Sequence, residues 1–120
     1  MNKNKRRAVY DKYGGRCAYC GHAITFKEMQ VDHIYPKSRL RGPEDAITRD
    51  KMDNLNPSCR MCNYYKRDMT LEEYRAYLGS LLARVGRSYI YRMALRYGLV
   101  TERQHDGVFY YEEMETKDGH

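Results

Sequence analysis

The chain contains no tryptophan, only 2 phenylalanines and 3 prolines, and no long apolar run. The absence of about 20 consecutive apolar residues argues against a membrane-spanning helix. The first residues, Met1–Arg7, are basic, but no apolar segment follows them, so they lack the pattern of a secretory signal. We therefore expect a cytoplasmic protein that does not enter a membrane.

The basic residues are concentrated in the first part of the chain. Residues 1–69 hold 15 Lys and Arg against 8 Asp and Glu, whereas residues 70–120 hold 7 against 8. The overall formal charge is +6, and the first part alone carries +7. A basic excess of this kind favours a polyanionic partner for that part. The 13 tyrosines suit half-exposed positions, including surfaces on which bases stack.

Four cysteines form two Cys-x-x-Cys pairs, Cys17/Cys20 and Cys59/Cys62. In a chain without export features, such pairs favour a thiolate metal site over disulfides, although disulfides and an iron–sulfur centre are the alternatives. Zinc is the expected ion, and because four thiolates complete its tetrahedral shell, the zinc is expected to be structural. Thirty-eight residues separate Cys20 from Cys59, so the ion would close a long loop.

The segments before and between the cysteine pairs suggest mixed secondary structure. The pattern predicts a basic helix over 3–13 ended by Gly14-Gly15, a strand over 29–34 and a polar loop over 36–53. An extended segment at 54–57 then leads to a helix capped by Ser58 that carries Cys62, Asn63 and Lys66. These elements predict a zinc-stapled α+β core over residues 1–69.

Residues 70–120 predict a helical extension. Thr70 and Glu73 form a capping box for a helix that reaches Gly86, and Ser88 begins a second helix through Tyr97. Asp106-Gly107 suggests a hairpin turn, and residues 113–120 are polar and expected to fray. The apolar stripe of the first helix favours packing onto the core, with a dimer or partner-protein contact through residues 70–100 as the alternative.

Several residues between and after the cysteine pairs resemble the HNH endonuclease family, which has the ββα-metal (His-Me finger) fold. The resemblance rests on three segments: Val31-Asp32-His33-Ile34-Tyr35-Pro36-Lys37-Ser38, Asp53-Asn54-Leu55, and Cys59-Arg60-Met61-Cys62-Asn63-Tyr64-Tyr65-Lys66. It covers about residues 13–68 and implies a divalent-metal-dependent nuclease. A bacterial or phage-infected cell is the setting that such a protein suggests.

The resemblance implies a role for each matched residue. His33 corresponds to the general base, Asp32 and Asn63 to ligands of the catalytic divalent ion, and Asn54 to the residue that ties the loop and orients the base. Lys66 corresponds to a residue near the substrate phosphate. These roles suit phosphodiester hydrolysis, because neutral imidazole can accept a proton from water and oxygen ligands suit Mg²⁺ or Mn²⁺.

Other basic residues are candidates for contacts with the nucleic-acid backbone: Lys37, Arg39, Arg41, Arg60 and Arg67. Phosphate contacts bind without reading sequence, so low sequence specificity is expected on DNA, with RNA not excluded. The rival hypotheses are a zinc-stapled nucleic-acid-binding module without catalysis, and an adaptor that works through residues 70–100 within a larger nucleic-acid-processing complex.

Overall fold

The computed structural model describes residues 1–40 and 42–118 and divides them into two compact units. The first unit comprises residues 1–71 together with the segment that begins at Phe109, and the second comprises Glu72–Val108. The second unit therefore starts close to the predicted boundary at residue 70. The chain returns to the first unit at Phe109, which the sequence did not indicate.

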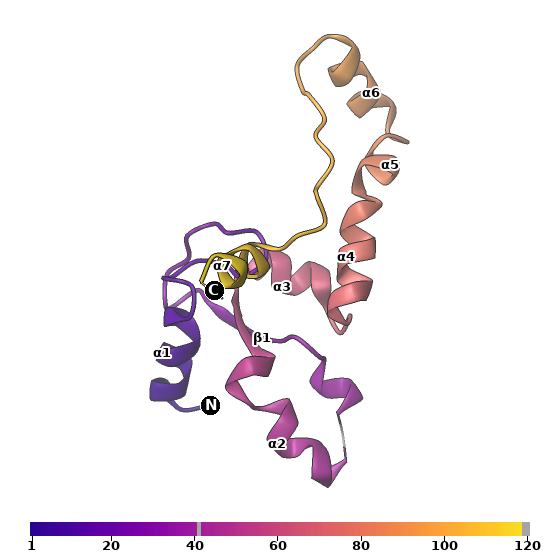
Figure 1. Ribbon diagram of the computed structural model, residues 1–120. Helices are drawn as coiled ribbons and strands as arrows, with labels where there is room; N and C mark the ends of the chain where they lie inside the picture. Colours follow the sequence, from indigo (N-terminus) through magenta and orange to yellow (C-terminus); the bar gives the residue numbers. More distant parts are fainter. Residues whose placement is uncertain (41, 119–120) are drawn as a thin grey trace. The chain divides into compact units, whose positions relative to one another are not determined.

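The first unit is built on two antiparallel strands followed by a helix (Figure 1). Strand β1 (Gln30–His33) pairs with β2 (Leu55–Ser58), and helix α3 (Arg60–Lys66) follows β2 directly. The register places Asp32 opposite Asn56 and His33 opposite Leu55. This ββα arrangement brings the Asp-His pair on β1 next to the helix that carries the second cysteine pair.

Helix α1 (Lys3–Asp11) begins directly after its N-cap residue, Asn2. The Asn2 side chain accepts a hydrogen bond from the backbone N–H of Lys5 at 2.7 Å, and such a cap satisfies one of the free donors of the first turn. Val9 is buried and forms the core with Met29 and Leu55, so α1 packs against the residue that precedes β1 and against the first residue of β2. The predicted helix over 3–13 is present but ends at Asp11.

The predicted polar loop contains several short helical turns. These are η1 (Lys37–Arg39), η2 (Pro43–Asp45), α2 (Ala46–Arg49) and η3 (Met52–Asn54). Arg41, a predicted contact for nucleic acid, lies outside the described residues.

Cys59, rather than Ser58, caps helix α3. The Cys59 sulfur accepts a hydrogen bond from the backbone N–H of Cys62 at 3.3 Å. The prediction of a Ser58 cap was wrong because Ser58 is still part of β2, where its buried hydroxyl donates to the Cys59 carbonyl at 3.0 Å.

The predicted hairpin around Asp106-Gly107 does not form. The Asp106 side chain accepts from the Val108 N–H at 2.9 Å, which makes a local turn, and helix α7 (Tyr110–Asp118) follows. Phe109 is fully buried, with its ring 5.3 Å from that of Tyr19. Burial of this aromatic side chain outweighs the hairpin signal. Helix α7, yellow in Figure 1, includes residues 113–118 of the segment 113–120 that was expected to fray, and residues 119–120 lie outside the described residues.

The second unit contains three helices, α4 (Leu71–Gly79), α5 (Leu81–Val85) and α6 (Tyr89–Arg96). The single helix predicted to reach Gly86 is interrupted at Gly79-Ser80, where the Ser80 hydroxyl donates to the Tyr77 carbonyl at 2.7 Å and competes with helical hydrogen bonding. The Ser88 cap of α6 is confirmed, since its side chain accepts from the Tyr91 N–H. Among the helices of the described residues, none combines the length and apolar character needed to cross a membrane.

Candidate active site and metal centre

The four cysteine sulfurs converge in the first unit. All four lie within 4.8 Å of one another, and the sulfurs of Cys20 and Cys59 are 3.9 Å apart. A Zn–S bond of about 2.3 Å in a tetrahedron places sulfurs about 3.8 Å apart, so the cluster fits a zinc ion. None of the four cysteines is in a disulfide bond, which disagrees with the disulfide alternative.

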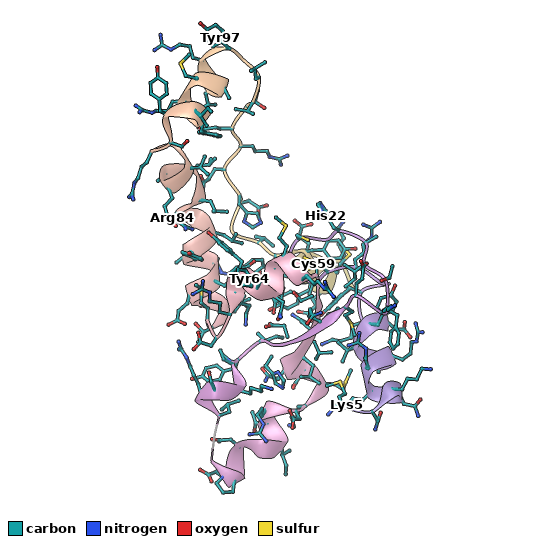
Figure 2. All side chains as sticks on the ribbon, turned by 180° about the vertical axis from the view of Figure 1, so that it is seen from behind. Lys5, His22, Cys59, Tyr64, Arg84 and Tyr97 are labelled. Carbon is teal, nitrogen blue, oxygen red and sulfur yellow. The ribbon has the colours of Figure 1, made fainter. Side chains whose placement is uncertain are left out.

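Local backbone geometry explains how the two cysteine pairs meet. The Cys17 N–H donates to the His22 carbonyl at 2.9 Å, and the Gly21 N–H donates back to the Cys17 carbonyl at 3.0 Å, which folds the first pair into a tight knuckle. The Ala18 N–H reaches the Pro57 carbonyl at 2.8 Å and joins this knuckle to β2. Cys59, labelled in Figure 2, then begins the helix that carries Cys62.

Asp32 is buried at the centre of the site, with only 4% of its surface exposed. Its carboxylate accepts a short hydrogen bond from the Tyr19 hydroxyl and forms an ion pair with Lys66 at 3.1 Å. Burial raises the pKa of Asp32, and the nearby Lys66 ammonium opposes this shift. A carboxylate has about four acceptor positions, so these contacts leave room for a further ligand.

His33 occupies the end of β1 and contacts Asp50, with 3.2 Å between Nε2 and Oδ1. The hydrogen bond from His33, together with the Arg49 charge, lowers the pKa of Asp50. An ionised carboxylate only accepts hydrogen bonds, so Nε2 of His33 is the donor in this contact.

Asn54 joins the two ends of the loop that surrounds His33. Its side-chain oxygen accepts from the Tyr35 N–H at 2.8 Å, and its amide group donates to the carbonyls of Tyr35 at 3.2 Å and Arg49 at 2.9 Å. The side chain therefore fixes the segment after His33 against the segment that carries Asp50.

Asp32, His33 and Asn63 line one cavity of about 340 Å³. Lys37 and Arg67 also line it and place cationic side chains at the same opening. Arg67 has φ 54°, a backbone conformation that is uncommon outside glycine, where α3 ends. Carboxylate and amide oxygens beside cationic groups fit a hard divalent ion together with a phosphate.

Lys66 does not take the position near a substrate phosphate that the resemblance to the HNH endonuclease family implied. Its side chain is fully buried, and its ammonium donates to the carboxylate of Asp32 and to the carbonyls of His33 and Ile34 at 3.1 and 3.3 Å. The predicted contact with a substrate phosphate is therefore not available in this structure. Lys66 instead holds the end of β1 against α3.

The remaining predicted contacts with nucleic acid are dispersed over the first unit. Arg39 is exposed on η1 and Arg60 on the first turn of α3. Neither belongs to the lining of the 340 Å³ cavity, unlike Lys37 and Arg67.

Two contacts of the site were absent from the sequence interpretation. Tyr19 lies inside the first cysteine knuckle and bonds Asp32, and Asp50 lies in the polar loop and bonds His33. No spacing pattern marks either residue, because each meets its partner only through the folding of a loop. Asp50 is one of four acidic residues in that loop, so the composition of the loop does not single it out either.

The segment that forms this site is similar in sequence to known proteins. The sequence model of the HNH endonuclease family matches residues 17–68. The CRISPR-associated endonuclease Cas9 of Corynebacterium diphtheriae is 41% identical over 51 residues, which are 42% of this chain and 4% of that protein. The crystal structure of the Type II-C Cas9 enzyme from Actinomyces naeslundii is similar with a TM-score of 0.52 at 28% identity, over 62% of this chain and 8% of that one.

These likenesses confirm the predicted fold class, a small α+β structure with a ββα arrangement and a cluster of four cysteines. The chain spans only a small share of the length of both relatives.

Proposed function

Because residues 17–68 belong to the HNH endonuclease family, we propose that the chain is a divalent-metal-dependent endonuclease that hydrolyses phosphodiester bonds in DNA. The observation that carries the proposal is the shared cavity of about 340 Å³ lined by Asp32, His33 and Asn63. A base and two oxygen donors around one opening are what this hydrolysis requires.

In this proposal His33 takes a proton from water through Nδ1, because Nε2 is engaged with Asp50. The water oxygen forms the new bond to phosphorus, and the bond between phosphorus and the 3′ oxygen breaks. Asp32 and Asn63 would hold Mg²⁺ or Mn²⁺, which when bound neutralises charge on the phosphate and on the departing oxygen. Lys37 and Arg67 attract the phosphate backbone to the cavity.

Zinc at Cys17, Cys20, Cys59 and Cys62 has a structural role in this proposal. Four thiolates leave no open position for water or substrate, so the ion does not take part in hydrolysis. It joins the knuckle before β1 to the start of α3, and thereby keeps the two donors of the catalytic ion on facing elements.

The test is incubation of the zinc-loaded chain with supercoiled plasmid and Mg²⁺ or Mn²⁺. We expect conversion to nicked or linear DNA, with a rate at least about 10²-fold lower for His33→Ala, the size of effect that general-base loss has. His22→Ala is the matched control, since His22 is an exposed histidine of the same unit and is labelled in Figure 2.

Equal cleavage by His33→Ala and wild type would contradict the assignment of the base. Binding of DNA without cleavage by any of several divalent ions would instead support the non-catalytic zinc-stapled binding module. A parallel assay with single-stranded RNA of the same sequence tests the choice of DNA as substrate. Contacts with phosphate do not read sequence, so we expect similar rates on unrelated plasmids.

A further inference from the structure

Asp50 contacts the one side chain to which the proposed function assigns proton transfer. Its Oδ1 lies 3.2 Å from Nε2 of His33, and its other carboxylate oxygen lies 3.8 Å from Nε of Arg49. The backbone carbonyl of Asp50 accepts from the Lys5 ammonium at 2.7 Å. Two side chains therefore face the carboxylate and a third holds the backbone of the same residue, although half of the Asp50 side chain is exposed.

The surrounding loop keeps this segment in place. The Asn54 amide donates to the carbonyl of Arg49 at 2.9 Å, one residue before Asp50. The Arg49 guanidinium also donates to the Leu40 carbonyl at 3.1 Å, which ties the two sides of the loop together. Asn54 thus acts on His33 through the Arg49-Asp50 backbone, and not by touching the imidazole.

His33 lines two cavities, and Lys37 also lines both. One of about 510 Å³ is lined by His33, Lys37, Arg49 and Asp50, and the other, of about 340 Å³, is lined by His33, Asp32 and Asn63. The carboxylate that binds Nε2 therefore belongs to the first cavity, and the proposed ligands of the divalent ion belong to the second. A ring whose Nε2 is committed to the Asp50 carboxylate has only its other nitrogen to offer to water.

We propose that Asp50 is a positioning residue that accepts the Nε2–H of His33, fixes the orientation of the ring and leaves Nδ1 as the nitrogen that takes the proton from water. The inference rests on the proposed function for its catalytic consequence, while the hydrogen bond itself is a property of the folded chain. A carboxylate beside a catalytic imidazole has this effect generally, because it selects one tautomer and one ring orientation.

The kinetic test compares Asp50→Ala, Asp50→Asn and Asp50→Glu in the full zinc-loaded chain. We expect Asp50→Ala to lower kcat about 10- to 100-fold, the cost of misplacing a catalytic group, while KM for a short DNA duplex changes less than about 2-fold. Asp50→Glu is expected to retain more kcat than either of the other variants, since it keeps an ionised carboxylate, whereas the Asn amide is neutral and can also present its NH2 group to the ring. Asp53→Asn removes an exposed carboxylate three residues further along and is expected to keep wild-type kcat.

A spectroscopic test does not depend on cleavage. Long-range ¹H–¹⁵N correlation of histidine-labelled protein, at a pH well above the ordinary imidazole pKa of about 6.5, reads which ring nitrogen of His33 carries the proton. We expect Nε2–H in wild type and in Asp53→Asn, and a change in the His33 ring signals in Asp50→Ala. Zinc content and circular dichroism of each variant establish that the fold is kept.

Two results would overturn the inference: His33 protonated at Nδ1 in wild type, or wild-type kcat in a folded Asp50→Ala. If wild type cleaves no nucleic acid while its spectrum shows Nε2–H that depends on Asp50, the proposed function fails and the hydrogen bond stands. If wild type cleaves and His33→Ala does not, but Asp50→Ala equals wild type, the function stands and the role of Asp50 fails.

Discussion

Lys66 and Asp32 form a buried ion pair on which the rest of the site depends. Lys66 has no exposed surface and Asp32 has 4%, and Tyr19 donates to the same carboxylate. Removal of one member of a buried pair leaves an uncompensated charge, which costs far more than the pair contributes when intact. The Lys66 ammonium therefore offsets part of the cost of burying the Asp32 carboxylate.

We expect Lys66→Met to lower the free energy of unfolding by about 3–5 kcal/mol, because the Asp32 carboxylate loses its buried counter-charge. The measurement is urea unfolding of the zinc-loaded protein. The double variant Asp32→Asn/Lys66→Met is expected to recover part of the loss, since no charge then remains in the pocket. Equal stability of Lys66→Met and wild type would show that the pair is not formed.

We expect Asn63→Ala to keep the fold and zinc but to require a higher Mg²⁺ concentration and to cleave roughly 10-fold or more slowly, as loss of a group that holds or orients a metal generally does. The measurement is cleavage rate against Mg²⁺ concentration. Asn4→Ala, on the exposed surface of α1, is the control. A normal rate at low Mg²⁺ would remove Asn63 from the ligand set.

At the scale of elements, helix ends decide where the site residues point. Cys59 combines two roles, because its sulfur caps α3 and also belongs to the four-cysteine cluster. The orientation of α3 therefore depends on the same atom that would bind zinc. This coupling explains why Asn63, one turn further along, can lie at the cavity beside β1.

We expect Cys59→Ala to lose zinc and to unfold the first unit, because zinc binding in small modules is worth on the order of 10 kcal/mol, comparable to the stability of a whole domain. Metal content and thermal melting measure this effect. Cys59→Ser keeps a capping oxygen but not the thiolate, so it separates the two roles and is expected to resemble Cys59→Ala. Unchanged metal content and melting in both variants would contradict the zinc staple.

Helix α6 offers a simpler case of control by a cap. Ser88 Oγ accepts from the Tyr91 N–H at 3.4 Å, and loss of such a cap costs about 1 kcal/mol. Ser88→Ala is therefore expected to speed hydrogen exchange of the Tyr91 amide by about 5-fold, with Thr101→Ala, an exposed threonine outside the helices, as the control. An unaltered exchange rate would show that the cap does not stabilise α6.

At the scale of the whole molecule, the two units differ in how well they bury apolar side chains. Within the second unit, Tyr74 is buried at 2% exposure, whereas four large side chains of its described residues are 71–80% exposed: Tyr89, Ile90, Tyr97 and Leu99. Exposed apolar side chains on so small a unit favour association with a partner. A dimer or partner-protein contact through residues 70–100 therefore remains our proposal for this part.

We expect the chain to associate as its concentration rises, and Ile90→Ser with Leu99→Ser to weaken that association. Sedimentation velocity over a range of concentrations measures the effect. Ile47→Ser is the matched control, because Ile47 is 77% exposed in the first unit. A wild-type chain that stays monomeric throughout would leave a different protein as the only partner of this kind.

Local patterns in the sequence were enough to predict which residues of the first unit come together. The cysteine spacing, Asp32-His33 and Asn63 are local patterns, and the structure gathers the cysteines into one cluster and the other three residues around one cavity. The Ser88 cap, the strand within 29–34 and the extended backbone at 54–57 were also predicted, because each depends on neighbours within a few residues.

The contacts that hold these side chains in place depend on the tertiary structure and could not be predicted from the sequence. Lys66 is buried and not exposed to a substrate. Asp50 hydrogen-bonds to His33 across a loop, and Phe109 packs against Tyr19 where a hairpin was predicted. Each outcome depends on contacts between residues distant in sequence, where the gain from burial or charge pairing exceeds a weak local preference. No period or motif in one sequence records which distant side chains will meet.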